Sequence, residues 1–295
     1  MGAVEHVVDT TQGRRLAVVE DGDPAGIPVL VHNGTPNSRL LYKHHVDDAV
    51  NRGLRLISYD RPGYGGSSPA PGRSVADCAA DVRAICSALN IDRLLTWGVS
   101  GGGPHVLATA ALLPDLVVAA TSVASIAPYG VEGLDYFEGM GELNAEDARL
   151  YFRDKDAARA KVDTDREEML SATREQVAAM LASLLSGPDA AVLSGDLAEY
   201  LEQSTHDGLA PGGEGWWEDG VAHLDDWGFD LDAISVPVLL LHGQQDQFVP
   251  FGHGVWLAAH IPGVKARLTA EDGHLTLSEL RIPEVHEWLL SKWAG

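Results

Sequence analysis

Short apolar runs alternate along the chain with longer segments in which apolar residues recur at helical spacing. Most of the short runs are continuous, which is typical of strands buried on both faces of a parallel sheet. Residues 4–10 and 15–22 instead alternate apolar and polar positions, as half-buried antiparallel strands do. The continuous runs lie at residues 28–32, 54–59, 93–97, 117–125, 237–243 and 265–270. Together these patterns predict eight strands.

Helical patterns separate these strands. Residues 74–90 begin with a Ser-x-x-Asp capping pattern, and residues 104–113 and 277–293 also have helical spacing. Strands and helices that alternate on this scale are typical of α/β proteins. We therefore predict a mostly parallel eight-stranded sheet with helices on both faces.

The alternation stops between residues 128 and 228. This stretch is acidic and rich in helical patterns, contains no convincing strand, and ends in a glycine-rich aromatic segment. We predict that residues 1–127 and 229–295 form one α/β core, and that residues 128–228 form a helical insertion. The aromatic residues that end the insertion are Trp216, Trp217 and Trp227. They either line a binding site or pack the insertion onto the sheet.

Composition limits the partners that this chain can have. A formal net charge of −22 disfavours nucleic acid and anionic membranes. Cys78 and Cys86 form no C-x-x-C pair, and we find no signal-peptide pattern and no apolar stretch long enough to span a membrane. We expect a soluble cytoplasmic protein that acts on a small molecule or a short peptide. The composition leaves the oligomeric state open.

The clearest chemical signal is the pentapeptide Gly98-Val99-Ser100-Gly101-Gly102, which matches G-x-S-x-G between a predicted strand and a predicted helix. A serine hydroxyl is a weak nucleophile, so it must stand exposed at the end of a strand beside a base. A sharp strand-to-helix turn achieves this exposure, and small neighbours avoid collisions there. We therefore predict that Ser100 is a nucleophile and that the N–H of Gly101 donates to an oxyanion.

Two further strand ends carry the groups that such a serine needs. Asp246 is the only acid in the segment LLLHGQQDQFVP, and His274 lies in DGHLTL after the last strand. Catalytic groups in open α/β sheets gather at the carboxyl ends of parallel strands. The chain order Ser, Asp, His is the order found in G-x-S-x-G hydrolases. We therefore predict a triad of Ser100, Asp246 and His274.

These residues, with the loop DRPGYGGSS at 60–68, resemble the serine enzymes of the α/β-hydrolase fold over nearly the whole chain. The resemblance implies that residues 128–228 are the helical cap of the family. It also implies a loop that supplies a second oxyanion donor. The usual H-G-x-P loop appears here in changed form, with Asn33 where histidine is usual, so the donor is either Thr35 or Gly34.

The resemblance implies hydrolysis of an ester or amide bond of a small molecule through an acyl-enzyme. It requires no cofactor, and because we find no H-E-x-x-H pair we expect no metal site. The adjacent histidines His44 and His45 are expected on a solvated helix surface.

Three alternatives stay open. The loop at 60–68 and the cap are most similar to the branch related to proline iminopeptidases, in which cap carboxylates hold a substrate amino group. The candidates for that role here are Glu132, Glu138, Glu142 and Glu214. A C–C hydrolase or lyase, and a non-catalytic ligand receptor on the same fold, are the other two. Epoxide hydrolases and dehalogenases need an aspartate where this chain has Ser100, so their chemistry is excluded.

Overall fold

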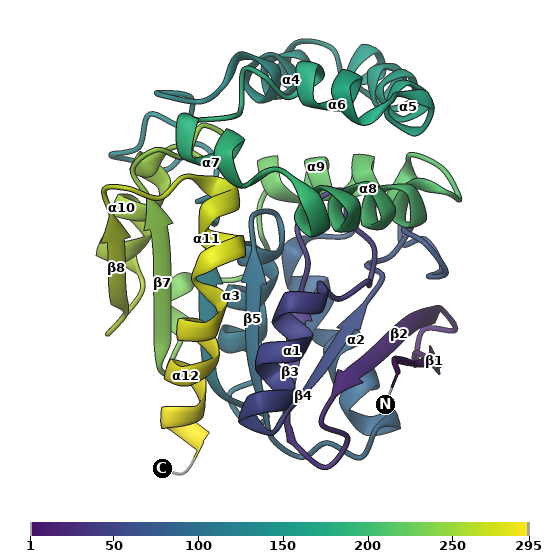
Figure 1. The fold of residues 1–295 in the computed structure, drawn as a ribbon, viewed down its shortest axis with the longest axis vertical. Helices are drawn as coiled ribbons and strands as arrows, with labels where there is room; N and C mark the ends of the chain where they lie inside the picture. The colour runs from purple at the N-terminus through teal and green to yellow at the C-terminus, as the bar shows by residue number, and fades with distance from the viewer. Residues whose placement is uncertain (1, 294–295) are drawn as a thin grey trace.

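Eight strands form one sheet in the computed structural model, which describes residues 2–293 (Figure 1). The order across the sheet is β1-β2-β4-β3-β5-β6-β7-β8. Only β2 runs antiparallel to its neighbours, and the other pairs are parallel. The strands are β1 Val4–Asp9, β2 Arg15–Gly22, β3 Ile27–His32, β4 Leu54–Tyr59, β5 Leu94–Val99, β6 Val117–Val123, β7 Val238–Gly243 and β8 Lys265–Thr269. The predicted α/β fold with its mostly parallel sheet is confirmed.

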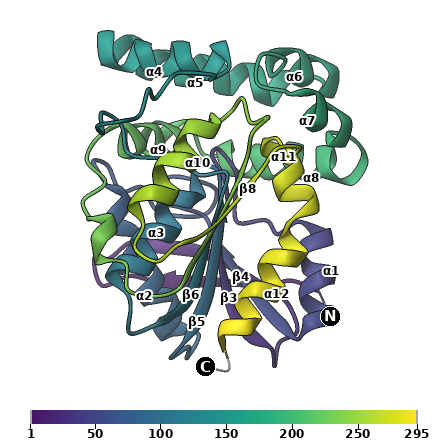
Figure 2. The same cartoon turned by 90° about the vertical axis from the view of Figure 1, so that its left-hand side faces the viewer.

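Helices cover both faces of the sheet, as Figure 2 shows. One face packs against α2, α3 and α10, and the other against α1, α11 and α12. The central strands are therefore buried on both sides, which explains their continuous apolar sequences. These helices are α1 Lys43–Arg52, α2 Cys78–Ala88, α3 Gly102–Leu112, α10 Phe251–His260, α11 His274–Leu280 and α12 Ile282–Trp293, with short 3₁₀ turns at Val75–Asp77 and Leu231–Ala233.

Six helices lie between β6 and β7, and in the described residues this segment contains no strand. They are α4 Glu142–Arg153, α5 Lys155–Ser171, α6 Arg174–Met180, α7 Gly187–Val192, α8 Gly195–Leu209 and α9 Glu214–Leu224. We call residues 128–228 the cap. In both views α4, α5 and α6 form an outer layer, whereas α8 and α9 lie closer to the sheet (Figures 1 and 2). The cap thus covers one end of the sheet in two layers.

The covered end is the carboxyl end of the parallel strands. The segments that follow β3, β5, β7 and β8 meet there, and they carry Thr35, Ser100, Asp246 and, at the first residue of α11, His274. No helix within residues 2–293 is both long enough and apolar enough to cross a membrane.

Candidate active site

Ser100 lies at the turn between β5 and α3, and its backbone has a φ of 56°. This left-handed conformation is unusual for a residue with a side chain and is typical of strained functional turns. The chain tolerates the turn because its neighbours are glycines. A Cβ added at Gly98 or Gly102 would lie closer than 3.0 Å to surrounding atoms. Side chains at these positions would therefore push the strand, the turn and the helix apart.

Asp246 and His274 lie together although 28 residues separate them in sequence. His274 Nδ1 donates to Asp246 Oδ2 at 2.7 Å. The other oxygen of Asp246 accepts hydrogen bonds from the backbone N–H groups of Phe248 at 2.9 Å and Val249 at 2.8 Å. The carboxylate is therefore fixed at both oxygens, and it directs the second imidazole nitrogen, Nε2, away from itself.

The environment of His274 favours its charged form. Burial by itself would lower the pKa of this histidine, but the charge and the hydrogen bond of Asp246 outweigh burial, and the charge of Asp189 adds to them. The pKa of His274 is therefore raised above its ordinary value of 6.5. The ring also stacks on Phe248, with 4.7 Å between ring centres. A base with a raised pKa accepts a proton readily.

The loop after β3 is braced by the buried polar groups of Asn33 and Arg61. The side-chain amide of Asn33 donates to the carbonyl oxygens of Ser38 at 2.7 Å and Leu40 at 3.0 Å. The guanidinium of Arg61 donates to the carbonyl oxygens of Asn33 at 2.5 Å and Gly34 at 3.1 Å. These bonds fix the backbone that presents the N–H groups of the loop to Ser100.

Asp219, on cap helix α9, connects this loop to the cap. It is fully buried and accepts hydrogen bonds from Arg61 at 2.6 Å, Arg73 at 2.6 Å, Tyr64 at 2.9 Å and the hydroxyl of Thr35 at 2.7 Å. Burial by itself would raise the pKa of Asp219, but the two guanidinium groups hold it well below its ordinary range. This charged cluster thus ties α9 to the predicted oxyanion loop.

Two histidines reach the carbonyl group of Gly101, the residue that follows Ser100. His223 of α9 donates through Nε2 at 3.0 Å, and His105 of α3 donates through Nδ1 at 2.9 Å. Burial lowers the pKa of His223 to about 4 and that of His105 well below 6.5, so both rings are neutral at pH 7. Helix α9 therefore contacts both segments that carry the predicted oxyanion donors.

Two cavities meet at Ser100. The larger lobe has a volume of about 520 Å³ and includes Gly101, Trp216 and Trp217 in its lining. The smaller lobe, of about 280 Å³, includes His274 and Gly34. Both lobes are lined by Thr35 and Ser100 and otherwise mainly by apolar residues. Every predicted catalytic and oxyanion residue except Asp246 thus lines at least one lobe, and Asp246 lies behind His274.

Trp227 does not line the pocket with Trp216 and Trp217, and one expectation about a histidine needs correction. Trp227 lines neither lobe; it is buried in the core against Phe229, and its indole N–H donates to the carbonyl oxygen of His223 at 3.3 Å. It therefore packs the end of the cap onto the core. His45 is not on a solvated surface: it is buried, it lines the smaller lobe, and its Nε2 donates to the carbonyl oxygen of Ser278 at 2.8 Å.

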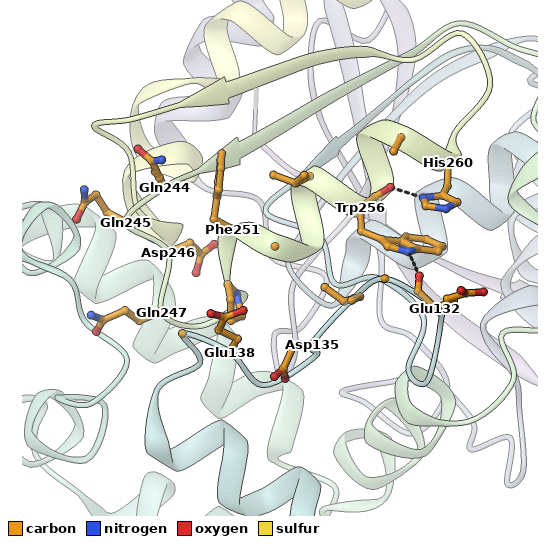
Figure 3. A pocket seen from close by; sticks show the side chains of 17 residues that line it. Glu132, Asp135, Glu138, Gln244, Gln245, Asp246, Gln247, Phe251, Trp256 and His260 are labelled. Carbon is orange, nitrogen blue, oxygen red and sulfur yellow. Dashed lines mark hydrogen bonds between the residues drawn. The ribbon is translucent and has the colours of Figure 1, made fainter.

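A third cavity, of about 560 Å³, lies beside α10 and is separate from the two lobes (Figure 3). Glu132 and Glu138 line it, and Trp256 donates to the carbonyl oxygen of Glu132 at 2.9 Å. Asp246 contributes to its wall, but Ser100 and His274 do not. Among residues 2–293, no group of three or more His, Cys, Asp and Glu side chains is arranged to hold a metal ion.

The fold agrees with comparisons to known proteins. The model of the alpha/beta hydrolase fold family matches residues 27–279, and the chain belongs to this family. It is 28% identical to a non-heme chloroperoxidase of Streptomyces lividans, with 83% of each chain covered. It is also 28% identical to epoxide hydrolase A of Mycobacterium tuberculosis, with 100% of this chain and 99% of that protein covered.

Two further similarities extend this picture. The chain is 27% identical to a bifunctional esterase/perhydrolase of Acinetobacter calcoaceticus, with 79% of each chain covered. The solved structure of a bromoperoxidase from Bacillus anthracis superposes with a TM-score of 0.72 at 20% identity, covering 98% of this chain and 100% of that one. The relatives carry several different names, so membership of the family does not by itself define the reaction of this chain.

Proposed function

We propose that this protein is a serine hydrolase that cleaves carboxylic esters of small, largely apolar molecules. The observation that carries the proposal is the hydrogen-bonded pair of Asp246 and His274, with Ser100 on a strained turn in the same cavity as His274. The similarity to a protein named as an esterase/perhydrolase is consistent with it.

In the proposed reaction His274 Nε2 removes the hydroxyl proton of Ser100 as the oxygen attacks the ester carbonyl. Asp246 holds the other imidazole nitrogen in its protonated form and stabilises the imidazolium. The oxyanion accepts hydrogen bonds from the N–H of Gly101 and of either Thr35 or Gly34. The tetrahedral intermediate then expels the alcohol, which takes the proton from His274. A water molecule, activated by His274 as base, then hydrolyses the acyl-enzyme.

The linings of the two lobes support one placement of the two halves of the substrate. The leaving alcohol must receive its proton from His274, which lines only the smaller lobe. The N–H of Gly101, which lines only the larger lobe, donates to the oxygen of the acyl carbonyl. We therefore place the acyl chain in the larger lobe and the alcohol in the smaller lobe.

The alternative of an aminopeptidase receives no support from the acids suggested for it. Glu132 and Glu138 line the separate cavity beside α10, and Glu214 pairs with Arg159 at 2.9 Å. Glu142, the fourth candidate, also lies outside both lobes. Epoxide hydrolysis, which the name of one relative suggests, conflicts with a serine at the position of the nucleophile.

The test is hydrolysis of a panel of p-nitrophenyl esters and aminoacyl arylamides, combined with labelling by an alkyl fluorophosphonate. We expect turnover of esters and a mass increase on Ser100 in the intact protein. The variant Ser100→Ala should lose both, whereas Ser87→Ala, at an exposed serine of α2, should retain both. Preference for an unblocked proline arylamide, or labelling of Ser100→Ala at the wild-type rate, would overturn the proposal.

A further inference from the structure

Asp189, on cap helix α7, makes an unusual set of contacts with the segment that begins at His274. Its carboxylate accepts hydrogen bonds from the backbone N–H groups of His274 at 2.8 Å, Leu275 at 2.8 Å and Thr276 at 3.0 Å. The hydroxyl of Ser186, also in the cap, donates to the same carboxylate at 3.0 Å. One cap side chain therefore binds three successive amides of the core, and the first belongs to the predicted base.

The contact is tightly enclosed. Asp189 is fully buried and His274 is 5% exposed. A Cβ added at Gly273, the residue before His274, would lie closer than 3.0 Å to the carboxylate of Asp189. The absence of a side chain at Gly273 is what lets the carboxylate approach these amides. Figure 1 shows α7 directly above the start of α11, the helix that His274 begins.

The geometry points to Asp189 as a positioning residue: it fixes the backbone of His274 so that the imidazole stays aligned between Asp246 and Ser100. The active arrangement of the base then depends on the cap, because the residue that holds the base lies on α7. This inference rests on the proposed hydrolase function and deepens it. Charged hydrogen bonds of this kind are among the stronger ones in proteins, which suits a fixing role.

Asp189 also contributes charge at the base. The carboxylates whose charge acts on His274 are Asp246 from the loop after β7 and Asp189 from α7. Other titratable groups in the lining of the same lobe are His45 of α1 and Tyr200, Glu202 and His206 of α8. His242 of β7 lies 3.9 Å from Asp246 and has a lowered pKa because it is buried. Asp272, close in sequence, is paired with Arg281 at 2.9 Å. The negative charge of Asp189 favours protonated His274, so its removal should shift the titration of His274 to lower pH.

The test compares Asp189→Asn with wild type by the rate constant for phosphonylation of Ser100 by an alkyl fluorophosphonate, measured between about pH 5 and pH 8. Asparagine keeps the size of the side chain but turns one acceptor into a donor that faces N–H groups. We expect labelling about 10- to 100-fold slower, because small displacements of a catalytic group have effects of this size. We also expect the acidic limb to move to lower pH, and kcat for the best ester to fall more than KM rises.

Two controls separate positioning from general damage. Asp156→Asn, at an exposed carboxylate of cap helix α5, should behave as wild type. Ser186→Ala removes only the bond from the cap hydroxyl, and it should slow labelling less than Asp189→Asn does. Thermal unfolding of each variant establishes that the chain is folded.

The possible outcomes distinguish the two proposals. Unchanged labelling and an unchanged pH profile in folded Asp189→Asn would overturn the positioning role while leaving the hydrolase proposal intact. Slower labelling with no pH shift, together with a rise in KM as large as the fall in kcat, would also overturn the positioning role. That pattern indicates a disturbed pocket. If wild type labels at Ser100 but hydrolyses no ester, the ester proposal fails, and the labelling rates still decide the role of Asp189.

Discussion

The cap contacts the candidate site on two sides. The oxyanion side carries the predicted donors of Thr35 and Gly101, the histidine side carries His274, and the cap holds the two in different ways. On the oxyanion side, Asp219 of α9 is paired with two buried guanidinium groups, those of Arg61 and Arg73. On the histidine side, Asp189 of α7 accepts hydrogen bonds from backbone amides. Both carboxylates are fully buried. The first contact links charged side chains of the cap and the core, whereas the second binds one short stretch of backbone.

This difference indicates that the cap is not a uniform lid. Helices α8 and α9 lie against the core, and the charge cluster of Asp219 connects α9 to the loop that carries the predicted oxyanion donor. The outer helices α4, α5 and α6 lie farther from the sheet (Figure 2). Their side chains line the larger lobe, Ala148 of α4 among them. Variation in the outer layer should therefore change what binds, whereas variation in α9 should change whether the protein folds and reacts.

The largest effect is expected on the histidine side from Asp246→Asn. The amide cannot hold the imidazole in the required tautomer, so kcat should fall about 10⁴-fold while the protein stays folded. Ester hydrolysis and circular dichroism measure the two quantities. The matched control is Asp272→Asn, at a second buried aspartate near His274 that pairs with Arg281 instead. Loss of activity in the control, with near-normal turnover in Asp246→Asn, would assign the acid to Asp272.

On the oxyanion side, Asp219→Ala should act first on stability. The change leaves the buried guanidinium groups of Arg61 and Arg73 without their carboxylate, so the free energy of unfolding should fall by about 3–5 kcal/mol. Denaturant unfolding measures it. Asp115→Ala removes an exposed carboxylate paired with Arg83 at 2.9 Å and should leave stability nearly unchanged. Equal denaturation midpoints for wild type and Asp219→Ala would show that the cluster does not stabilise the fold.

The part of the substrate that each lobe binds can be tested by narrowing one lobe at a time with a phenylalanine. Ala148→Phe of α4 narrows the larger lobe, and Ala198→Phe of α8 narrows the smaller one. For an ester with a long acyl chain and a short alcohol, the first variant should lower kcat/KM about 10-fold or more. The second variant should do the same for the isomer with a short acyl chain and a long alcohol. The opposite pairing would reverse our assignment of acyl and alcohol sides.

The fold and the pairing of Asp246 with His274 could be predicted because they leave local signals in the sequence. Continuous apolar runs mark buried strands, glycines surround Ser100, and both other residues directly follow strands. Asp219 and Asp189 carry no such signal, because they lie among the 43 acidic residues of the chain, many of them in the cap. Arg61 and Asp219 meet across 158 residues. Only packing of the cap onto the core brings such residues together.

The smallest effect concerns pH and tests the charges that surround His274. Catalysis requires neutral His274, and because its pKa is raised above 6.5, the acidic limb of kcat/KM should have its midpoint above pH 6.5. The same raised pKa stabilises the folded state fully below pH 6.5, and this contribution is lost as pH rises through the folded pKa. A pH–rate profile, with wild-type unfolding followed over the same range, measures both. A midpoint below pH 6.5 would indicate that burial outweighs the carboxylates of Asp246 and Asp189.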